Sequence, residues 1–188
     1  VTGHAGEELR SYIEEKFKDS SIEFVFVHNS NYDKSNNIYS LYMAKEYLEQ
    51  DDTILLESDL IFDKNIVKNV VQYPSENVVT VAKYEPWMDG TVTLLTEEDY
   101  IKEFVEKKDF KFKRKGEYYK TVNIYKFSKE FSQKTYVPFL EAYIKSYGTN
   151  EYYELVLKAI SHLSCSCLKA YKLSNEKWYE IDDAQDLD

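Results

Sequence analysis

The sequence predicts an α/β fold: a sandwich with a mixed, mostly parallel sheet, formed by residues 1–188 as a single domain. Segments with the spacing of amphipathic helices alternate with short runs of β-branched and aromatic residues, which is typical of parallel strands joined by helices. No repeat and no Pro-, Gly- or Ser-rich linker divides the chain, and its length suits one domain. A composition that is 43 % hydrophobic and 31 % charged is typical of a chain that buries a core.

The first half of the chain contains three predicted helices and three predicted strands. The helices carry apolar residues three or four positions apart; in the first these are Leu9, Tyr12, Ile13 and Phe17. The strands are short and largely apolar runs, such as IEFVFV and TILL, which indicate burial. In chain order we expect a helix at 6–17, a strand at 22–27, a helix at 37–48, a strand at 53–56, a helix at 64–73 and a strand at 77–82.

The second half begins with extended stretches and continues with helices. Gly148 suits the position after a helix, because glycine readily adopts the left-handed conformation that commonly ends one. The basic run at 107–115 is interpreted as a solvated hairpin edge, where charge blocks unwanted pairing; contact with an anionic substrate, RNA or a membrane surface is the alternative. The predicted elements are extended stretches at 91–95 and 121–127, helices at 128–147 and 151–163, and strands at 168–173 and 177–181.

Charge and composition exclude several classes of protein. With a net charge of −10 the chain has no general basic face, so nucleic acid is not an expected partner. No apolar run exceeds four residues, so no membrane span is expected. We interpret Cys165 and Cys167, the only cysteines, as reduced thiols, which predicts a cytoplasmic location. The five glycines never form a Gly-rich phosphate-binding loop.

Carboxylates follow two of the predicted strands. Asp59 comes directly after the strand at 53–56, where open α/β sheets gather ligands, and it could hold Mg²⁺; a helix cap or a turn is the alternative. Glu180 and Asp182 project from one face of the last strand, and two such carboxylates repel unless a cation lies between them. Capping of a final helix by Asp182 or Asp183 is the alternative for that pair.

Two further segments could contact a ligand. Asn37 and Ser40 stand at the start of the second predicted helix, where free N–H groups and amide side chains can bind a nucleotide; capping alone is the alternative. The turn K-Y-E-P-W-M-D-G at 83–90 and the segment N-E-Y-Y-E at 150–154 combine rings with carboxylates, which suits a cationic ligand. Core aromatic residues with solvated charges are the alternative for both.

Taken in order, these segments carry a family resemblance. The motifs are N-N-x-x-S-L at 36–41, L-x-S-D at 56–59, K-Y-E-P-W-M-D-G-T at 83–91, K-T-V-N-I-Y-K-F-S at 120–128, N-E-Y-Y-E and W-Y-E-I-D-D at 178–183. The set resembles the nucleotidyltransferases that include CTP:phosphocholine and 2-aminoethylphosphonate cytidylyltransferases. The resemblance implies a three-layer α/β/α Rossmann-like fold and Mg²⁺-dependent transfer of CMP from CTP to a small aminophosphonate or amino-alcohol phosphate, with release of pyrophosphate. Of the two acceptors it slightly favours 2-aminoethylphosphonate.

The resemblance also implies roles for individual residues. Asp59 and Lys83 would be catalytic, Asp59 would share a metal ion with Glu180 and Asp182, and Asn37 and Ser40 would lie near the cytosine. The amine head of the acceptor would be surrounded by residues of the two aromatic segments, namely Trp87, Asp89, Tyr152, Tyr153 and Glu154.

One family feature has no match in this sequence. Members begin with a strand and a Gly-rich loop that holds the triphosphate, whereas V-T-G-H-A-G resembles a later junction. We therefore expect an N-terminal β-α unit to be missing from this chain, which would be inactive by itself, and an aminotransferase-like domain to be a fused or separate partner. A sugar-phosphate nucleotidyltransferase, a metal-dependent glycosyltransferase and a non-catalytic binding module are the alternatives; E-S-D at 57–59 in place of D-x-D disfavours the glycosyltransferase.

Overall fold

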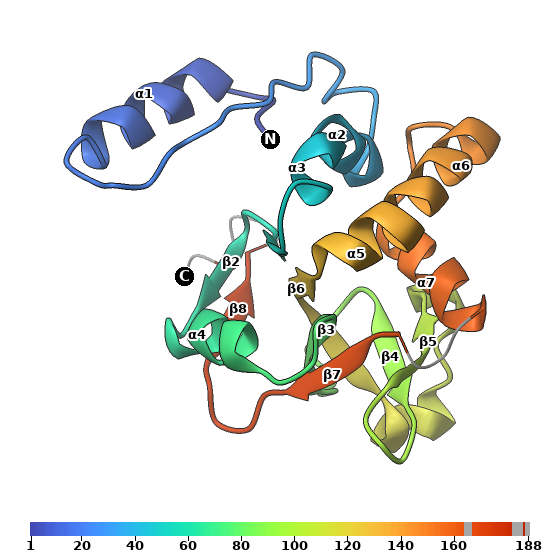
Figure 1. Cartoon of the computed structure of the whole chain (residues 1–188). Helices are drawn as coiled ribbons and strands as arrows, with labels where there is room; N and C mark the ends of the chain where they lie inside the picture. Colours follow the sequence, from blue (N-terminus) through green and yellow to red (C-terminus); the bar gives the residue numbers. More distant parts are fainter. Residues whose placement is uncertain (164–166, 182–185, 187–188) are drawn as a thin grey trace.

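The structure, a computed structural model, describes residues 1–163, 167–181 and 186 and centres on a six-stranded mixed sheet. Five strands lie in the order β5-β4-β6-β3-β7, and β1 also pairs with β6 (Figure 1). Strand β2, which follows β1 in the chain, forms a separate antiparallel pair with β8. The strands are β1 (Thr53–Leu56), β2 (Leu60–Phe62), β3 (Val78–Lys83), β4 (Val92–Leu95), β5 (Ile101–Val105), β6 (Tyr119–Phe127), β7 (Lys169–Lys172) and β8 (Trp178–Glu180).

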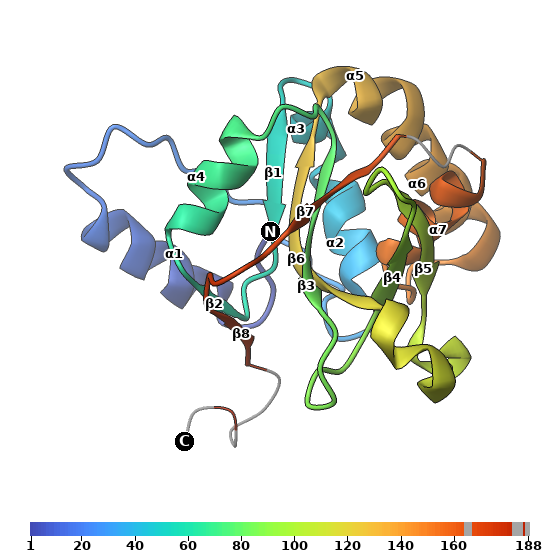
Figure 2. The same ribbon diagram turned by 90° about the horizontal axis from the view of Figure 1, so that it is seen from below.

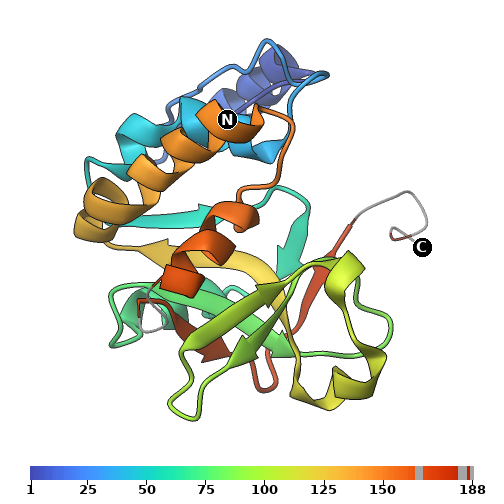
Figure 3. The same cartoon turned by 90° about the vertical axis from the view of Figure 1, so that its right-hand side faces the viewer.

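Helices cover both faces of this sheet and make the fold three-layered (Figures 2 and 3). On one face α2, α5, α6 and α7 bury the larger core, to which Tyr125, Phe127 and Leu140 contribute. On the other face α4 and the β2–β8 pair pack over Val78, Val122 and the neighbouring apolar side chains. The helices are α1 (Gly6–Lys16), α2 (Asn37–Met43), α3 (Lys45–Leu48), α4 (Asn65–Gln72), α5 (Lys129–Phe131), α6 (Val137–Tyr147) and α7 (Glu154–Leu163), with a π turn at Ser132–Tyr136.

The predicted α/β class and the mixed sheet are confirmed, but the expectation of mostly parallel strands is wrong. Among the described strands only β3 and β7 pair in parallel. Strands β1 and β3 do run in the same direction, as their connection through α4 predicts. However, β6 lies between them and pairs antiparallel with both. Alternation of helices and strands sets the direction of a strand, whereas the identity of its neighbour depends on contacts between distant parts of the chain.

The predicted buried strand at 22–27 does not form. Residues 22–27 form no regular element, and Val27 accepts one backbone hydrogen bond from Thr2 beside the isolated bridge between Thr2 and His28. Phe24 and Val25 remain 38 % and 53 % exposed. A strand requires a neighbour for its backbone N–H and C=O groups, and none of the described strands lies beside this run.

Other boundaries differ in smaller ways. The predicted helix at 37–48 is interrupted at Ala44, which separates α2 from α3, and the short strands β2 and β5 were not predicted. The basic run is not a hairpin edge: Lys107–Asp109 and Phe112–Glu117 form 3₁₀ turns between β5 and β6. Gly148 ends α6 at a φ of 90°, as predicted. In the described part of the chain no helix is both long and apolar enough to cross a membrane.

Strand β6 organises the middle of the molecule. One of its edges pairs with β3, while its other edge pairs with β4 at Tyr119 and Lys120 and with β1 from Ile124 to Phe127. The sheet therefore splits between β1 and β4. Polar side chains from the carboxyl end of β1 and from the central part of β6 face this split, and the candidate site lies there.

Candidate active site

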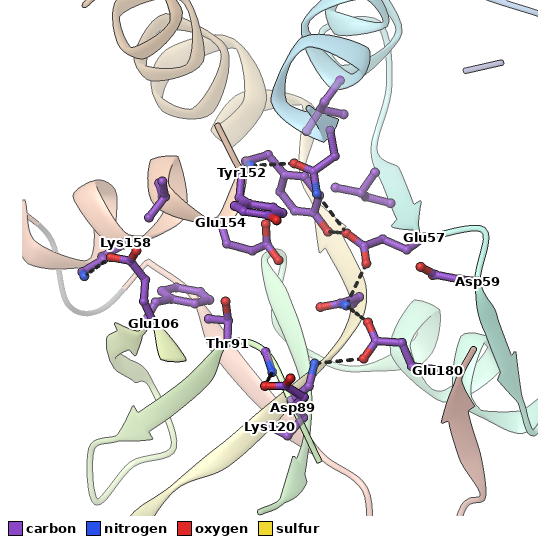
Figure 4. A pocket seen from close by; sticks show the side chains of 18 of the residues that line it. Glu57, Asp59, Asp89, Thr91, Glu106, Lys120, Tyr152, Glu154, Lys158 and Glu180 are labelled. Atoms are coloured by element: carbon purple, nitrogen blue, oxygen red, sulfur yellow. Dashed lines mark hydrogen bonds and ion pairs between the residues drawn. The ribbon is translucent and has the colours of Figure 1, made fainter. Parts of the chain in front are cut away.

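A cleft of about 970 Å³ opens where the sheet splits (Figure 4). Its walls come from the end of β1, the start of α2, the segment before β4, the middle of β6, the start of α7 and the end of β8. Carboxylates and lysines dominate its polar lining: Glu57, Asp59, Asp89, Glu106, Glu154 and Glu180 against Lys107, Lys108, Lys120 and Lys158.

Three of these carboxylates form a cluster. Glu57, Asp59 and Glu180 each offer an oxygen atom, and the three atoms lie within 4.8 Å of one another. The β2–β8 pair brings Glu180 to this place, because Leu60 lies opposite Glu180 and the Ile181 N–H donates to the Asp59 carbonyl oxygen at 2.9 Å. Asp59 Oδ1 is buried and has no hydrogen-bond partner among the described residues. Hard oxygen donors at this spacing can hold a divalent cation such as Mg²⁺.

The Glu57 carboxylate accepts three side-chain hydrogen bonds. The Tyr153 hydroxyl donates to its Oε1 at 2.8 Å, and the Asn37 amide donates to the same atom at 3.4 Å. The Asn123 amide donates to Oε2 at 2.7 Å. Burial, followed by the nearby charge of Glu154, raises the pKa of Glu57 to about 7. In the metal-free protein Glu57 is therefore partly protonated near neutral pH.

Strand β6 supplies a buried cation beside this cluster. Lys120 is 2 % exposed, donates from Nζ to the Thr121 carbonyl oxygen at 2.9 Å and lies 3.3 Å from Glu180 Oε2. Gly90 faces it with a φ of 87°, and a Cβ atom there would lie 3.4 Å from Lys120 Nζ. The Glu180 carboxylate compensates the charge of this buried lysine, and an anionic ligand in the cleft could do the same.

The wall formed by the start of α7 and the residues before it contains side chains that suit a cationic ligand. Glu154 is 9 % exposed, its Oε2 has no hydrogen-bond partner among the described residues, and burial raises its pKa. Tyr152 lies beside it at the cleft with 57 % of its surface exposed. Tyr153, by contrast, is buried and holds Glu57, and its ring packs edge-on against Tyr125.

Ion pairs lie along the rim of the cleft. Asp89 Oδ2 lies 2.5 Å from Lys107 Nζ, and the hydrogen bond from this lysine lowers the pKa of Asp89. Lys158 on α7 pairs with Glu106 at 2.7 Å, and Lys108 pairs with the other oxygen of Glu106 at 2.8 Å. These pairs compensate the rim carboxylates, so Glu154 is the carboxylate of this wall that lacks a cation within ion-pair distance among the described residues.

The structure brings most of the sequence-predicted residues together. Asp182 lies outside the described residues, and Lys83 and Trp87 do not line the cleft. The predicted nucleotide contacts Asn37 and Ser40 line it, but the Asn37 side-chain carbonyl accepts from the Tyr153 backbone and Ser40 accepts from Asn29. The predicted residues that line the cleft are Asn37, Ser40, Asp59, Asp89, Tyr152, Tyr153, Glu154 and Glu180.

Lys83 and Trp87 belong to neighbouring surfaces instead. Lys83 lies opposite Tyr119 in the sheet, and its Nζ sits over that ring at 4.4 Å and donates to the Gly116 carbonyl oxygen. The next residue of β6, Lys120, points to the other face, because side chains alternate along a strand. Trp87 stacks on Tyr179 of β8, with 5.8 Å between the ring centroids.

Sequence reasoning missed three residues that shape the cleft. Glu57 stands two positions before Asp59, and a strand-like alternation would have placed both side chains on one face. Lys120 and Asn123 are polar residues in a strand that is buried along most of its length, and a buried polar residue is a signal that could have identified them as functional candidates. Their spacing of three does not place two side chains on one face of a regular strand, so only the structure joins them.

Solved structures of known proteins share this fold. The chain superposes on the CTP:phosphocholine cytidylyltransferase of Streptococcus pneumoniae with a TM-score of 0.75 and 20 % identity, covering 96 % of this chain and 71 % of that one. The inositol-1-phosphate CTP transferase of T. maritima gives a TM-score of 0.68 at 19 % identity, with 99 % of this chain and 70 % of that one covered. The chain therefore has the nucleotidyltransferase fold, with an acidic cleft at the carboxyl end of a strand.

Comparisons of the sequence with protein families and with curated proteins give two further matches. The chain matches the family described as a domain of unknown function, DUF6564, over residues 1–109, and it belongs to that family. It is also 24 % identical over 188 residues to the CMP-5'-(3-aminopropyl)phosphonate synthase of Streptomyces rubellomurinus (strain ATCC 31215). That match covers 99 % of this chain and 29 % of the relative, so the chain spans under a third of the relative's length.

Proposed function

We propose that this chain is a cytidylyltransferase domain that transfers CMP from CTP to a small ω-aminoalkyl phosphonate, or to a similar amino-alcohol phosphate, with release of pyrophosphate. The observation that carries the proposal is the carboxylate cluster of Glu57, Asp59 and Glu180 beside buried Lys120, in a cleft of a nucleotidyltransferase fold. In-line transfer of a nucleotidyl group needs positioned reactants and compensated charge more than a covalent nucleophile.

The carboxylate cluster fits a magnesium ion. Asp59 has a buried oxygen atom without a partner among the described residues, and the three side chains supply carboxylate oxygens only, which suits Mg²⁺ rather than a softer metal. Asp59 and Glu180 would hold the ion, with Glu57 beside them, and Asp182 stays a predicted further ligand. A bound Mg²⁺ would neutralise phosphate charge as it develops on the leaving pyrophosphate.

Lys120 is suited to bind the acceptor's phosphonate. Its ammonium group has three N–H donors; one bonds to Thr121 and the ion pair with Glu180 engages another. Among the described residues a third donor is left for a phosphonate oxygen in the cleft, next to Gly90, whose missing side chain leaves room. The lysine would orient the acceptor and compensate its charge as it approaches the α-phosphorus of CTP.

Glu154 and Tyr152 are suited to bind the acceptor's amine. A protonated amine would supply the partner that the buried oxygen of Glu154 lacks among the described residues, and a charge-assisted hydrogen bond would form. The exposed ring of Tyr152 offers a π face to the same cation. This wall distinguishes an amine-bearing acceptor from a sugar phosphate, which has no cation to place there.

Pyrophosphate release tests the proposal directly. The protein that carries this chain is mixed with CTP, Mg²⁺ and either 2-aminoethylphosphonate, 3-aminopropylphosphonate or phosphocholine; UTP with glucose 1-phosphate is the sugar arm. We expect release with CTP and an amine-bearing acceptor, and a loss of at least about 100-fold in Asp59→Asn. Release in the sugar arm alone, or full activity of Asp59→Asn, would contradict the proposal.

A further inference from the structure

We infer that Asn123 is a positioning residue, whose side-chain amide holds Glu57 and Glu180 together so that both can face one divalent cation. This inference rests on the metal site of the proposed function. The two carboxylates come from distant parts of the chain, one after β1 and one at the end of β8, and no backbone hydrogen bond between described residues joins Glu57 to Glu180. Asn123 on β6 donates a hydrogen bond to each of them.

The hydrogen bonds show how the bridge works. Asn123 Nδ2 donates to Glu57 Oε2 at 2.7 Å and to Glu180 Oε1 at 2.7 Å, so each of its two N–H bonds serves one carboxylate. Ionised carboxylates only accept hydrogen bonds, so a group that bridges two of them must be a donor or a cation. Each bonded oxygen still keeps a lone pair for a metal ion. Without the bridge, like charges would favour separation of the two side chains.

The backbone of β6 is distorted at this residue. A regular antiparallel ladder that pairs Val79 with Tyr125 would pair Val81 with Asn123, but Val81 pairs with Thr121. Asn123 lies in this bulge with a φ of 56°. A left-handed conformation is unfavourable for a non-glycine residue, and asparagine tolerates it better than most. Bulges of this kind redirect a side chain, here into the cleft.

Tyr125 sets the orientation of the amide. Its hydroxyl donates to Asn123 Oδ1 at 3.4 Å, and Tyr125 is fully buried. The carbonyl end of the amide is therefore held by a donor, and its NH₂ end is directed to the carboxylates. Partners that hold metal ligands in this way typically change metal affinity by about 10–100-fold when they are removed.

The test is Asn123→Gly, because glycine keeps the left-handed backbone and removes only the side-chain amide. Mn²⁺ serves as the probe, and its dissociation constant is measured by calorimetry on the metal-free protein, with circular dichroism to show that the fold is retained. We expect Asn123→Gly to weaken Mn²⁺ binding by about 10–100-fold. Asp99→Gly is the matched control, because Asp99 also has a positive φ of 62° but lies outside the cleft. The Mn²⁺ affinity of this variant should equal that of the wild type.

The outcomes separate this inference from the proposed function. Equal Mn²⁺ affinity in Asn123→Gly and wild type would overturn the role of Asn123 alone. A wild type that binds no Mn²⁺ would overturn the metal site and the inference with it. If Asn123→Gly does not fold, Tyr125→Phe decides, because it removes only the hydroxyl that orients the amide. Weaker Mn²⁺ binding in that variant supports the inference, and unchanged binding overturns it.

Discussion

Glu57→Gln is expected to stabilise the metal-free protein above pH 7 and to alter its stability little at pH 5. Burial and the charge of Glu154 raise the pKa of Glu57 from 4.5 to about 7 in the folded protein. Glutamine carries no charge to bury, and its amide oxygen can still accept the hydrogen bond from Asn123. The substitution therefore removes a pH-dependent cost and retains most of the packing.

The size of the effect follows from the difference between the two pKa values of Glu57. Between pH 4.5 and 7 the folded protein holds the Glu57 proton and the unfolded chain does not, so the free energy of unfolding falls as the pH rises. A pKa that is higher by one in the folded state corresponds to about 1.36 kcal/mol, which makes the full loss about 3 kcal/mol once the pH exceeds 7. The wild type loses this stability and Glu57→Gln does not.

Urea unfolding measures this difference. Wild type and Glu57→Gln are unfolded at pH 5 and pH 8 with a chelator present, so that no divalent cation compensates the carboxylates. The stability advantage of the variant should grow by about 2.5 kcal/mol between the two pH values, because a small part of the full loss has already occurred at pH 5. An advantage of equal size at both would refute the reasoning, because it would show that Glu57 has the same proton occupancy in the folded and unfolded states across this range.

The remaining predictions concern the acceptor. Lys120→Met is expected to lower kcat/KM for pyrophosphate release by about 100-fold or more. The kcat/KM of Lys83→Ala should stay near the wild-type value, because Lys83 does not line the cleft. The reverse result would restore the catalytic role that the sequence predicts for Lys83. Glu154→Gln should raise the KM for an aminophosphonate by about 10–100-fold, because a buried charge-assisted bond is lost. Steady-state kinetics measure this KM, and an unchanged value would show that Glu154 does not bind the amine.

Local patterns predicted much of the fold. The run Thr53–Leu56 forms β1 with the predicted bounds, and α4 and β3 lie within about one residue of theirs, because hydrophobic spacing along a short segment reflects which face it buries. The position of Asp59 after β1 also follows from the sequence, since the carboxyl end of a strand is where an open α/β sheet binds ligands. These inferences needed no knowledge of distant contacts.

The run at 22–27 shows the limit of such patterns. Its composition is that of a buried strand, yet it forms no strand and Phe24 and Val25 stay exposed, because strand formation depends on a neighbour as well as on composition. The same dependence made the sheet less parallel than predicted: β6 enters between β1 and β3, and nothing within those three segments specifies that order.

The sequence by itself determined the α/β class, the carboxylate at the end of β1 and the acidic, aromatic character of the cleft. Only the tertiary structure decided which lysine faces that cleft, because Lys83 and Lys120 lie on adjacent strands and alternation sends them to opposite faces. The role of Asn123 likewise depends on a bulge set by pairing with β3. Periodicity is a property of neighbours in sequence, whereas register, bulges and the convergence of distant carboxylates arise when strands far apart in the chain pair.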